Sequence, residues 1–340
     1  MDALDSGALA AAARLTARAG LPAPGKVERL AGGKNNRVFQ VDDALVLKLY
    51  HWDARDTRDR LRAEWCFLKY AWDRGVANIP RPLASDPDLH AGLYSLLPGG
   101  KLIAGQVTQA HVDAALAFVL AINAAPRAPD TLDSGSEACF SLNEHIATID
   151  RRVARLASID PAVSAGEAAR SLIASHLIPA WTEVRATLLA EAENAGLDPG
   201  ETVAGVCVSP SDFGFHNALV SGEEIGFLDF EYAGRDDPAK LVCDFFCQPE
   251  VPVPVRHHPD FVRRLSAGLG LDAASRARCA LLLDAYRVKW ACIILNDFLP
   301  LGSARRVWAA LTAADKEQTA ARHDAQLARA AAKLNEIAPI

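Results

Sequence analysis

The spacing of hydrophobic residues changes near residue 100, and this change constrains the fold more than any other feature of the sequence. Before it, short apolar or alternating runs are separated by turn residues, a pattern typical of strands in an antiparallel meander. Two longer stretches, at 3–19 and 55–72, repeat hydrophobic residues at helical spacing and predict helices. The predicted strands are 27–30, 37–41, 44–50 and 93–97.

After residue 100 the hydrophobic pattern is mostly helical. Three short β-type runs interrupt it, at 203–208, 218–220 and 225–230, and polar residues are crowded between the first two. The sequence therefore predicts an α+β fold, with a β-hairpin set among helices. The predicted helices are 112–123, 142–156, 168–194, 261–269, 273–298 and 313–337.

Charge and composition exclude several classes of function. The 340 residues carry a net charge of −6, which argues against a broad nucleic-acid binder because such a protein needs a basic face. The longest apolar stretch, near 114–125, is too short to span a bilayer. Asp2 and Asp5 stand where a secretory signal needs positive charge. We expect a cytoplasmic protein of one large or two smaller domains, with no nucleic-acid or membrane partner.

The seven cysteines indicate buried thiols rather than a disulfide framework. Their number is odd, and the sequence contains no C-x-x-C motif. Cys243 and Cys247 lie four residues apart, but no histidine pair at ligand spacing accompanies them, so a zinc site is not expected there.

Three polar residues near the predicted hairpin suggest phosphoryl-transfer chemistry. Asp212 and Asn217 lie five residues apart on one loop, and Asp229 follows twelve residues later, at the end of an apolar run. Two oxygen ligands from adjacent loops suit Mg²⁺, which also takes phosphate oxygens and water. A separate carboxylate that accepts a hydroxyl proton would complete such a site. The alternative is that Asp and Asn simply populate turns.

A second group of residues, nearer the N-terminus, suggests phosphate binding. The segment GGKNN at 32–36 joins two predicted strands, and backbone amides of a glycine turn can approach phosphates closely. Lys48 follows in the next strand, on the face opposite Leu47 and Leu49, where it would need an anion. Glu64 on the next predicted helix can pair with it. The alternative is a solvated strand lysine.

Taken together, these residues resemble the aminoglycoside phosphotransferase and choline kinase group, small-molecule kinases with a protein-kinase-like fold. The resemblance covers nearly the whole chain: a glycine turn, a strand lysine, a helix glutamate, a hinge after Tyr94, D-x4-N and a strand aspartate. The sequence DFEY at 229–232 is similar to a stretch common in the choline kinase branch. The resemblance implies a bilobal fold, with a β-rich lobe at 1–97 that binds nucleotide phosphates and a helical lobe at 98–340 that carries the catalytic loop and the substrate site.

The resemblance also implies roles for individual residues. Asp212 would be the catalytic base, and Asn217 and Asp229 would bind Mg²⁺. Lys48 would contact the α- and β-phosphates of ATP, with Glu64 as its ion-pair partner. The remaining nucleotide contacts would come from the glycine turn and from a hinge at 95–97 that meets the adenine, through Gly32, Gly33, Asn35, Asn36, Ser95 and Leu97.

The sequence departs from the group's pattern at two places. Pro210 and Ser211 stand before Asp212, where the group usually has His-Gly. The group also tends to have a second aspartate about four residues after Gly-Asp-Pro, whereas Asp244 here lies seven residues after Asp237. We expect Asp244 to stabilise the catalytic loop nonetheless.

The predicted function is transfer of the γ-phosphate of ATP, with Mg²⁺, to a hydroxyl of a small molecule of amino alcohol, aminoglycoside or sugar type. Aromatic residues could line the acceptor site or belong to the core: Tyr232, Tyr286, Trp290 and Phe298. Three acidic residues could attract an aminated acceptor, face solvent in a turn, or brace the structure: Glu231, Asp236 and Asp237.

A protein kinase and an inactive nucleotide-binding protein are the two alternatives to this function. A protein kinase is disfavoured because G-x-G-x-x-G and A-P-E segments are missing. A catalytically weak or inactive nucleotide-binding protein is the other alternative, and its support is the altered pair Pro210-Ser211.

Overall fold

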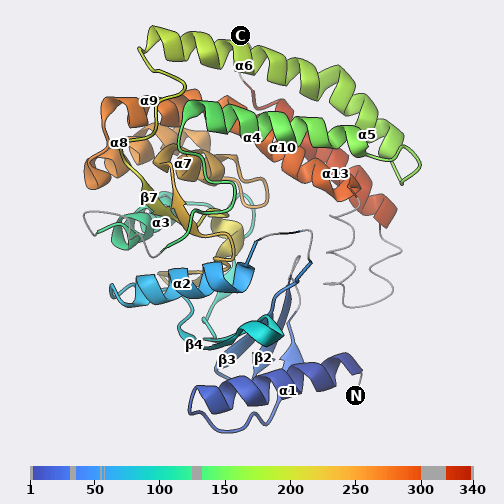
Figure 1. The fold of residues 1–340 in the computed structure, drawn as a ribbon, viewed down its shortest axis with the longest axis vertical. Coiled ribbons are helices and arrows are strands. Elements are labelled where there is room, and N and C mark those ends of the chain that lie inside the picture. The colour runs from blue at the N-terminus through green and yellow to red at the C-terminus, as the bar shows by residue number, and fades with distance from the viewer. Residues whose placement is uncertain are drawn as a thin grey trace.

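The computed structural model describes residues 3–30, 36–53, 56, 58–124, 132–299 and 319–337. It shows an α+β fold, as predicted. A sheet with helices beside it lies in the lower part of Figure 1, and a larger group of helices lies above it. One cluster of buried hydrophobic side chains lies between the first helix and the sheet. A second and larger cluster extends through most of the later helices.

Five strands form an antiparallel sheet in the order β1-β2-β3-β5-β4. The strands predicted near 27–30, 37–41, 44–50 and 93–97 are confirmed. The sequence pattern does not predict β4, because Pro80 and Pro82 indicate a break there. Pro82 is the first residue of this edge strand, a position that proline tolerates. The strands are β1 (Val27–Arg29), β2 (Arg37–Val41), β3 (Leu45–Leu49), β4 (Pro82–Asp86) and β5 (Ala91–Ser95).

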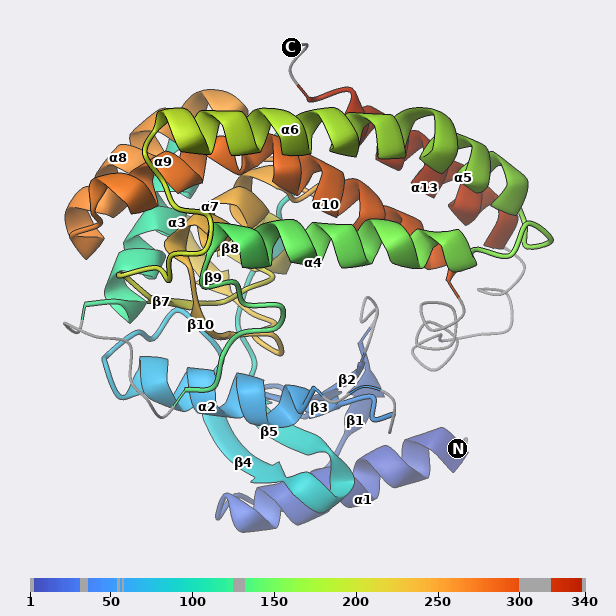
Figure 2. The same ribbon diagram turned by 45° about the horizontal axis from the view of Figure 1, so that its top comes forward.

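Helices α1 (Ala3–Arg18) and α2 (Arg60–Trp72) lie on either side of this sheet (Figures 1 and 2). Leu47 of β3 belongs to the buried cluster that α1 forms with the sheet. Because successive side chains of a strand point to opposite faces, Lys48 faces α2. α2 begins at Arg60, because the Asp59 side chain accepts a hydrogen bond from the Arg62 amide (2.9 Å) and caps the helix, and residue 55 of the predicted stretch lies outside the described residues.

The larger group of helices agrees with most of the predicted ones. The stretch predicted at 168–194 is one long rod, in which a π-helical turn, Ile173–Leu177, joins α5 to α6. The stretch predicted at 273–298 is divided at Leu282 into α9 and α10, and residues 313–318 of the last prediction lie outside the described residues. The helices are α3 (Gln109–Ile122), α4 (Leu142–Arg155), α5 (Gly166–Leu172), α6 (Ile178–Asn194), α7 (Pro238–Cys247), α8 (His258–Leu269), α9 (Ala273–Leu281), α10 (Leu283–Leu295) and α13 (Thr319–Leu334).

Helix α7 is not predicted by the hydrophobic pattern, and its burial explains why. All ten of its residues are buried, including Lys240 and Asp244. Its two charged residues, Lys240 and Asp244, lie four residues apart and share one face, but a ten-residue run that is otherwise largely apolar is too short to be told from a buried strand by its pattern.

The strands beyond residue 100 position the loop between residues 209 and 217. β8 (Ala218–Ser221) and β9 (Glu224–Phe227) form the predicted hairpin, and β6 (Gly100–Lys101) pairs with β8. The run predicted at 203–208 is not part of that hairpin. It contributes β7 (Cys207–Ser209), which pairs with β10 (Gly234–Asp236), a strand absent from the prediction.

Two further expectations can be compared with the structure. Six of the seven cysteine side chains are buried and Cys66 is half-buried, in agreement with the predicted buried thiols. Among the helices that the structure describes, none has both the length and the apolar character needed to cross a membrane.

Candidate active site

Lys48 and Glu64 form a buried ion pair between the sheet and α2. Lys48 Nζ lies 2.7 Å from Glu64 Oε2, and Lys48 also contacts Asp229 Oδ1. Burial opposes the charge on Lys48, but Asp229 and Glu64 outweigh it and raise the pKa of this lysine well above its usual range. The predicted pairing of Lys48 with Glu64 is therefore present, and Lys48 carries a charge although it is buried.

Glu64 also connects α2 with the segment that follows β9. Its Oε1 accepts a hydrogen bond from the Phe230 amide (3.3 Å), and its Oε2 accepts one from the Tyr50 hydroxyl (2.6 Å). The Phe230 ring stacks on Phe67 of α2 with 4.5 Å between centroids. These contacts place Asp229 beside Lys48. Asp229 itself adopts a left-handed backbone conformation (φ 70°), which turns the chain at this point.

Asp212 lies on the loop after β7, immediately before two buried phenylalanines of the same loop. Phe213 and Phe215 are 3% and 0% exposed, whereas the Asp212 side chain keeps 33% of its surface exposed. His216 Nε2 lies 3.3 Å from Asp212 Oδ1. The alternation of buried rings and polar side chains holds the loop to the core while its carboxylate reaches solvent.

Asn217 connects the Asp212 loop to Asp229. Its Nδ2 donates a hydrogen bond to the Asp212 carbonyl (3.1 Å), and its own carbonyl accepts one from the Leu228 amide (2.9 Å). Asp212, Asn217 and the residue that precedes Asp229 are thus linked in one hydrogen-bonded segment. The three residues singled out in the sequence lie in one region of the structure.

The predicted glycine turn is only partly described. Gly32, Gly33 and Asn35 lie outside the described residues. Asn36 is buried, and its side-chain amide donates a hydrogen bond to Glu231, while its Oδ1 accepts one from the His51 amide (3.3 Å). The Asn36 side chain is therefore bonded within the protein. The predicted contact of Asn36 with the nucleotide would have to come from its backbone.

Ser95 and Leu97 lie where the chain leaves the sheet. The Ser95 hydroxyl accepts a hydrogen bond from the Arg81 amide (2.8 Å). The Leu97 side chain packs against Gly226 of β9, where an added Cβ would lie 3.1 Å from Leu97 Cδ1. The segment 95–97 thus runs from β5 toward the hairpin that follows the Asp212 loop. Its predicted contact with adenine is not tested by these contacts.

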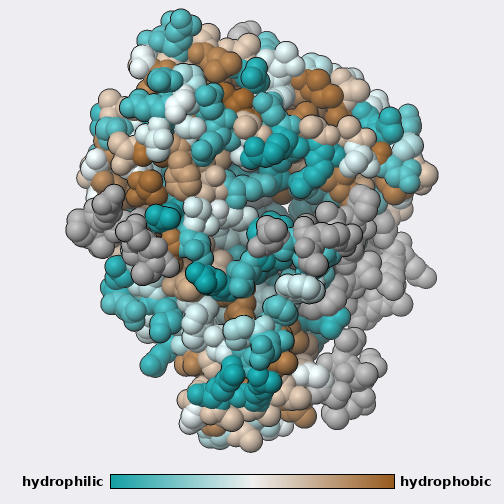
Figure 3. All heavy atoms as spheres, viewed as in Figure 1, coloured by the Kyte–Doolittle hydropathy of each residue, from teal (hydrophilic) through white to brown (hydrophobic). Residues whose placement is uncertain are grey.

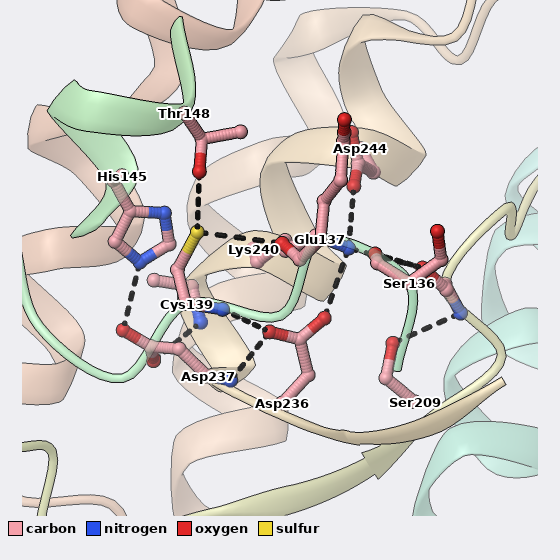
Figure 4. A network of polar contacts seen from close by, with 12 residues as sticks. Ser136, Glu137, Cys139, His145, Thr148, Ser209, Asp236, Asp237, Lys240 and Asp244 are labelled. Carbon is pink, nitrogen blue, oxygen red and sulfur yellow. Dashed lines mark hydrogen bonds and ion pairs between the residues drawn. The ribbon is translucent and has the colours of Figure 1, made fainter. Parts of the chain in front are cut away.

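The acidic residues suggested for the acceptor are buried and already paired with protein groups. Asp236 and Asp237 are both 0% exposed. Asp237 caps α7 through the Ala239 amide (3.0 Å) and binds Arg278 (2.9 Å) and His145 (3.2 Å). Figure 4 shows this network beside the start of α7. Of the three suggested roles, a structural brace fits these two aspartates.

The aromatic residues suggested for the acceptor wall also lie mainly in the core. Tyr286, Trp290 and Phe298 are 1%, 8% and 3% exposed, and only Tyr232 is half-buried. Trp290 Nε1 donates a hydrogen bond to Asp244 (3.0 Å), and the Tyr286 hydroxyl lies 2.8 Å from His145 Nδ1. These three side chains belong to the packing of α10 and the turn after it.

Asp244 contacts the Asp212 loop indirectly. Its carboxylate lies 3.2 Å from Lys240 Nζ, and Lys240 in turn donates to the Ser211 hydroxyl (3.1 Å). Sequence reasoning missed Lys240 of α7 and Lys289 of α10, which both contact Asp244. Neither the contact of Lys240 with Ser211 nor that of Lys289 with Asp244 is local in sequence. The described residues contain no group of three or more His, Cys, Asp or Glu side chains arranged to bind a metal.

The face shown in Figure 3 is mainly hydrophilic between the level of α2 and the level of α4. This band lies between the two groups of elements. The two groups of elements both contribute to the site. The sheet contributes Lys48 from β3, and the segments around the β8–β9 hairpin contribute Asp212 and Asp229. The arrangement suits a polar, charged ligand.

Comparison with known proteins gives a match to one family and a set of solved structures with the same fold. Residues 26–282 match the profile of a family described as the phosphotransferase enzyme family. No curated protein is significantly similar to the chain in sequence.

Several solved structures share the fold at low sequence identity. A choline/ethanolamine kinase family protein from Mesorhizobium loti is 19% identical, with a TM-score of 0.51, over 97% of this chain and 98% of that one. The macrolide 2′-phosphotransferase MphH from Brachybacterium faecium is 21% identical, with a TM-score of 0.54, over 92% and 97%. APH(2″)-IIa in its ternary complex with streptomycin and ATP is 14% identical, with a TM-score of 0.53, over 91% and 96%.

Proposed function

The chain belongs to the phosphotransferase enzyme family, and on that premise we propose that it transfers the γ-phosphoryl group of ATP, with Mg²⁺, to a hydroxyl of a small molecule. The observation that carries this proposal is the convergence of Lys48, Glu64 and Asp229 beside the Asp212 loop. A buried, charged lysine next to two half-buried carboxylates, those of Asp229 and Asp212, is an arrangement suited to a nucleotide and its metal.

In this proposal the nucleotide binds between a lobe formed by residues 1–97 and a lobe formed by residues 98–340. The segment 95–97 joins the lobes and meets the adenine, and the turn containing Gly32, Gly33, Asn35 and Asn36 covers the phosphates. Ion pairing with Glu64 orients Lys48 toward the α- and β-phosphates. The complex of ATP with a structurally similar protein supports this choice of nucleotide.

Asn217 and Asp229 are the residues that would bind Mg²⁺. Their amide and carboxylate oxygens are hard ligands, and 35% of the Asp229 side-chain surface is exposed, so the donor set fits a cation that keeps phosphate and water ligands. When bound, the ion would neutralise charge that develops on the transferred phosphoryl group.

Asp212 would act as the general base. Its carboxylate is a third exposed and contacts the His216 ring, so it can approach an acceptor hydroxyl and accept its proton. Phe213 and Phe215 fix the backbone of the same loop in the core, which restricts the directions that the carboxylate can take.

The acceptor in this proposal is an amino alcohol, an aminoglycoside or a sugar. The structurally similar proteins are a choline/ethanolamine kinase family protein, a macrolide phosphotransferase and a protein that binds streptomycin, and all three classes belong in a first acceptor panel. The buried Asp236 and Asp237 are not available to bind an aminated acceptor, so its contacts must come from other residues.

The proposal is tested by phosphorus NMR of the protein with ATP, Mg²⁺ and this acceptor panel. We expect transfer to one class of acceptor, and a loss of about 100-fold or more in kcat for Asp212→Asn. Asp324→Asn, which alters an exposed aspartate of α13, is the matched control and should behave as wild type. Wild-type protein that binds ATP but neither transfers nor hydrolyses its phosphate would overturn the proposal and favour an inactive nucleotide-binding protein.

A further inference from the structure

The two places where the sequence departs from the family pattern meet at one buried lysine. Ser211 precedes Asp212 at a position where the family usually has glycine, and Asp244 lies seven residues after Asp237. In the structure, Lys240 Nζ lies 3.1 Å from Ser211 Oγ and 3.2 Å from Asp244 Oδ2. Figure 4 shows Lys240 between Asp236 and Asp244, close to the loop that carries Ser209.

Ser211 adopts a backbone conformation that its side chain disfavours. Its φ of 66° lies in the left-handed region, where glycine is preferred because a Cβ atom is crowded there. The surrounding contacts fix this conformation: the Ser211 amide donates to Ser209 Oγ (3.0 Å), and the Ser211 hydroxyl donates to the Ser136 carbonyl (3.4 Å) while accepting from Lys240. A strained turn immediately before Asp212 is therefore fixed by hydrogen bonds.

Lys240 is itself fixed from several directions. It lies 2.9 Å from Asp236 Oδ2, and Asp244 is held in turn by Lys289 (2.8 Å) and Trp290 (3.0 Å). Burial opposes the charge on Lys240, but Asp236 and Asp244 outweigh it and raise the pKa of this lysine above its usual range. The side chain is 1% exposed, so it contacts protein groups rather than a bound ligand.

We infer that Lys240 is a positioning residue, which acts through the Ser211 hydroxyl to fix the turn that directs Asp212 toward the acceptor. The inference rests on the proposed function for the role of Asp212. A hydrogen bond from a charged donor is stronger than one from a neutral donor. The direction of the Lys240 ammonium group is fixed by two carboxylates, that of Asp236 on β10 and that of Asp244 on α7. Small displacements of a catalytic group reduce the rate strongly, so a turn that relaxes by a fraction of an ångström is expected to slow transfer.

The test compares two substitutions of Ser211 that differ in backbone preference. Ser211→Ala removes the hydroxyl and keeps the Cβ, whereas Ser211→Gly removes the hydroxyl and suits the left-handed turn. Both should lower kcat by about ten-fold and leave the KM for ATP within about two-fold, because the lysine and metal sites are untouched. The melting temperature of Ser211→Gly should equal or exceed that of Ser211→Ala. If Ser211 had only a structural role, the variant with the higher melting temperature, Ser211→Gly, would also have the higher kcat.

A second readout does not depend on phosphoryl transfer. Amide hydrogen exchange should be faster across 209–217 in both Ser211 variants and unchanged across α7. Ser266→Ala, which alters a buried serine of α8, is the control and should change neither the rate nor the exchange of the loop. Lys240→Met should reproduce the loop effect, and if that variant fails to fold, the Ser211 pair decides.

The outcomes separate this inference from the proposed function. Absence of transfer by wild-type protein overturns the proposed function, and loop exchange then still reports on the contact between Lys240 and Ser211. Wild-type kcat and wild-type loop exchange in both Ser211 variants would overturn the inference while leaving the kinase activity intact.

Discussion

Lys48 Nζ lies 2.7 Å from Glu64 Oε2 across the boundary between β3 and α2, and both side chains are almost fully buried. The pair is not isolated, because Lys48 also contacts Asp229 and Glu64 also accepts the Phe230 amide. One carboxylate of α2 thus orients a lysine of the sheet and a backbone segment beyond the hairpin. This contact links the sheet to the segment that follows the hairpin.

Glu64→Gln is therefore expected to weaken ATP use without removing the lysine. The neutral amide no longer competes with Asp229 for Lys48, so Lys48 is drawn toward Asp229 and away from the phosphates. We expect kcat/KM for ATP to fall by about ten-fold or more, which corresponds to about 1.4 kcal/mol of transition-state stabilisation. Steady-state kinetics with varied ATP measure this. Glu167→Gln on the exposed start of α5 is the control, and unchanged kinetics in Glu64→Gln would contradict the role given to this pair.

The stability of the fold should fall between pH 6.5 and pH 9 because of His145. Burial disfavours the protonated ring, but Asp237 outweighs burial and raises the pKa of His145 to about 9. Since the unfolded value is near 6.5, the stabilisation is complete below pH 6.5 and is lost as the pH rises through 9. We expect a loss of about 2–3 kcal/mol in the free energy of unfolding at the alkaline end.

Urea unfolding at pH 6 and at pH 9.5 measures the effect of His145. His145→Gln should be less stable than wild type at pH 6 and should lose most of the pH dependence. His176→Gln, which alters an exposed histidine, should keep the wild-type pH dependence. A wild-type midpoint that is equal at both values of pH would rule out a charged His145 in the folded protein.

The metal requirement should depend on the oxygen at position 217. EDTA should abolish transfer, and added Mg²⁺ should restore it. In Asn217→Ala the Mg²⁺ concentration for half-maximal rate should rise by about 10–100-fold, whereas Asn217→Asp keeps an oxygen ligand and should be affected less. Asn143→Ala, an exposed position on α4, serves as the control. Equal Mg²⁺ dependence in Asn217→Ala and wild type would exclude Asn217 as a ligand.

Phe213→Ala should reduce stability and activity together. Its ring is 3% exposed and packs against three other rings at centroid distances of 5.2–5.6 Å: Phe118, Phe227 and Phe245. Loss of such a buried ring costs about 3–5 kcal/mol. Phe213→Leu fills more of the cavity and should cost less. Urea midpoints and kcat measured on the same samples test this, and an Ala variant as stable as wild type would show that the ring does not fix the loop.

Much of the sheet, and the pairing of Lys48 with Glu64, could be predicted because they depend on patterns that are local in the sequence. The alternation of β3 places Lys48 opposite Leu47, and the helical spacing after residue 60 supplies Glu64 to the same side. The spacing of Asp212, Asn217 and Asp229 is likewise local, because two strands of one hairpin bring them together.

The remaining features depend on contacts between distant segments, which no local pattern encodes. α7 is short, largely apolar and wholly buried, so its helical state is hard to infer from its pattern, and the role of Lys240 depends on Ser211, which lies 29 residues away in sequence. Asp236 and Asp237 resemble a solvated acidic turn in sequence. Their partners Lys240, Arg278 and His145 become apparent only in the folded chain.

The burial of α7 has a consequence for synthesis of the chain on the ribosome. Asp237 and Asp244 leave the exit tunnel before Arg278 and Lys289, which follow them by 41 and 45 residues. Until those cations emerge, α7, whose ten residues are all buried in the folded protein, exposes apolar side chains beside carboxylates that lack these partners. During this interval the nascent chain exposes apolar surface that the folded protein buries. Such surface promotes aggregation, and chaperones are expected to bind the chain at this stage.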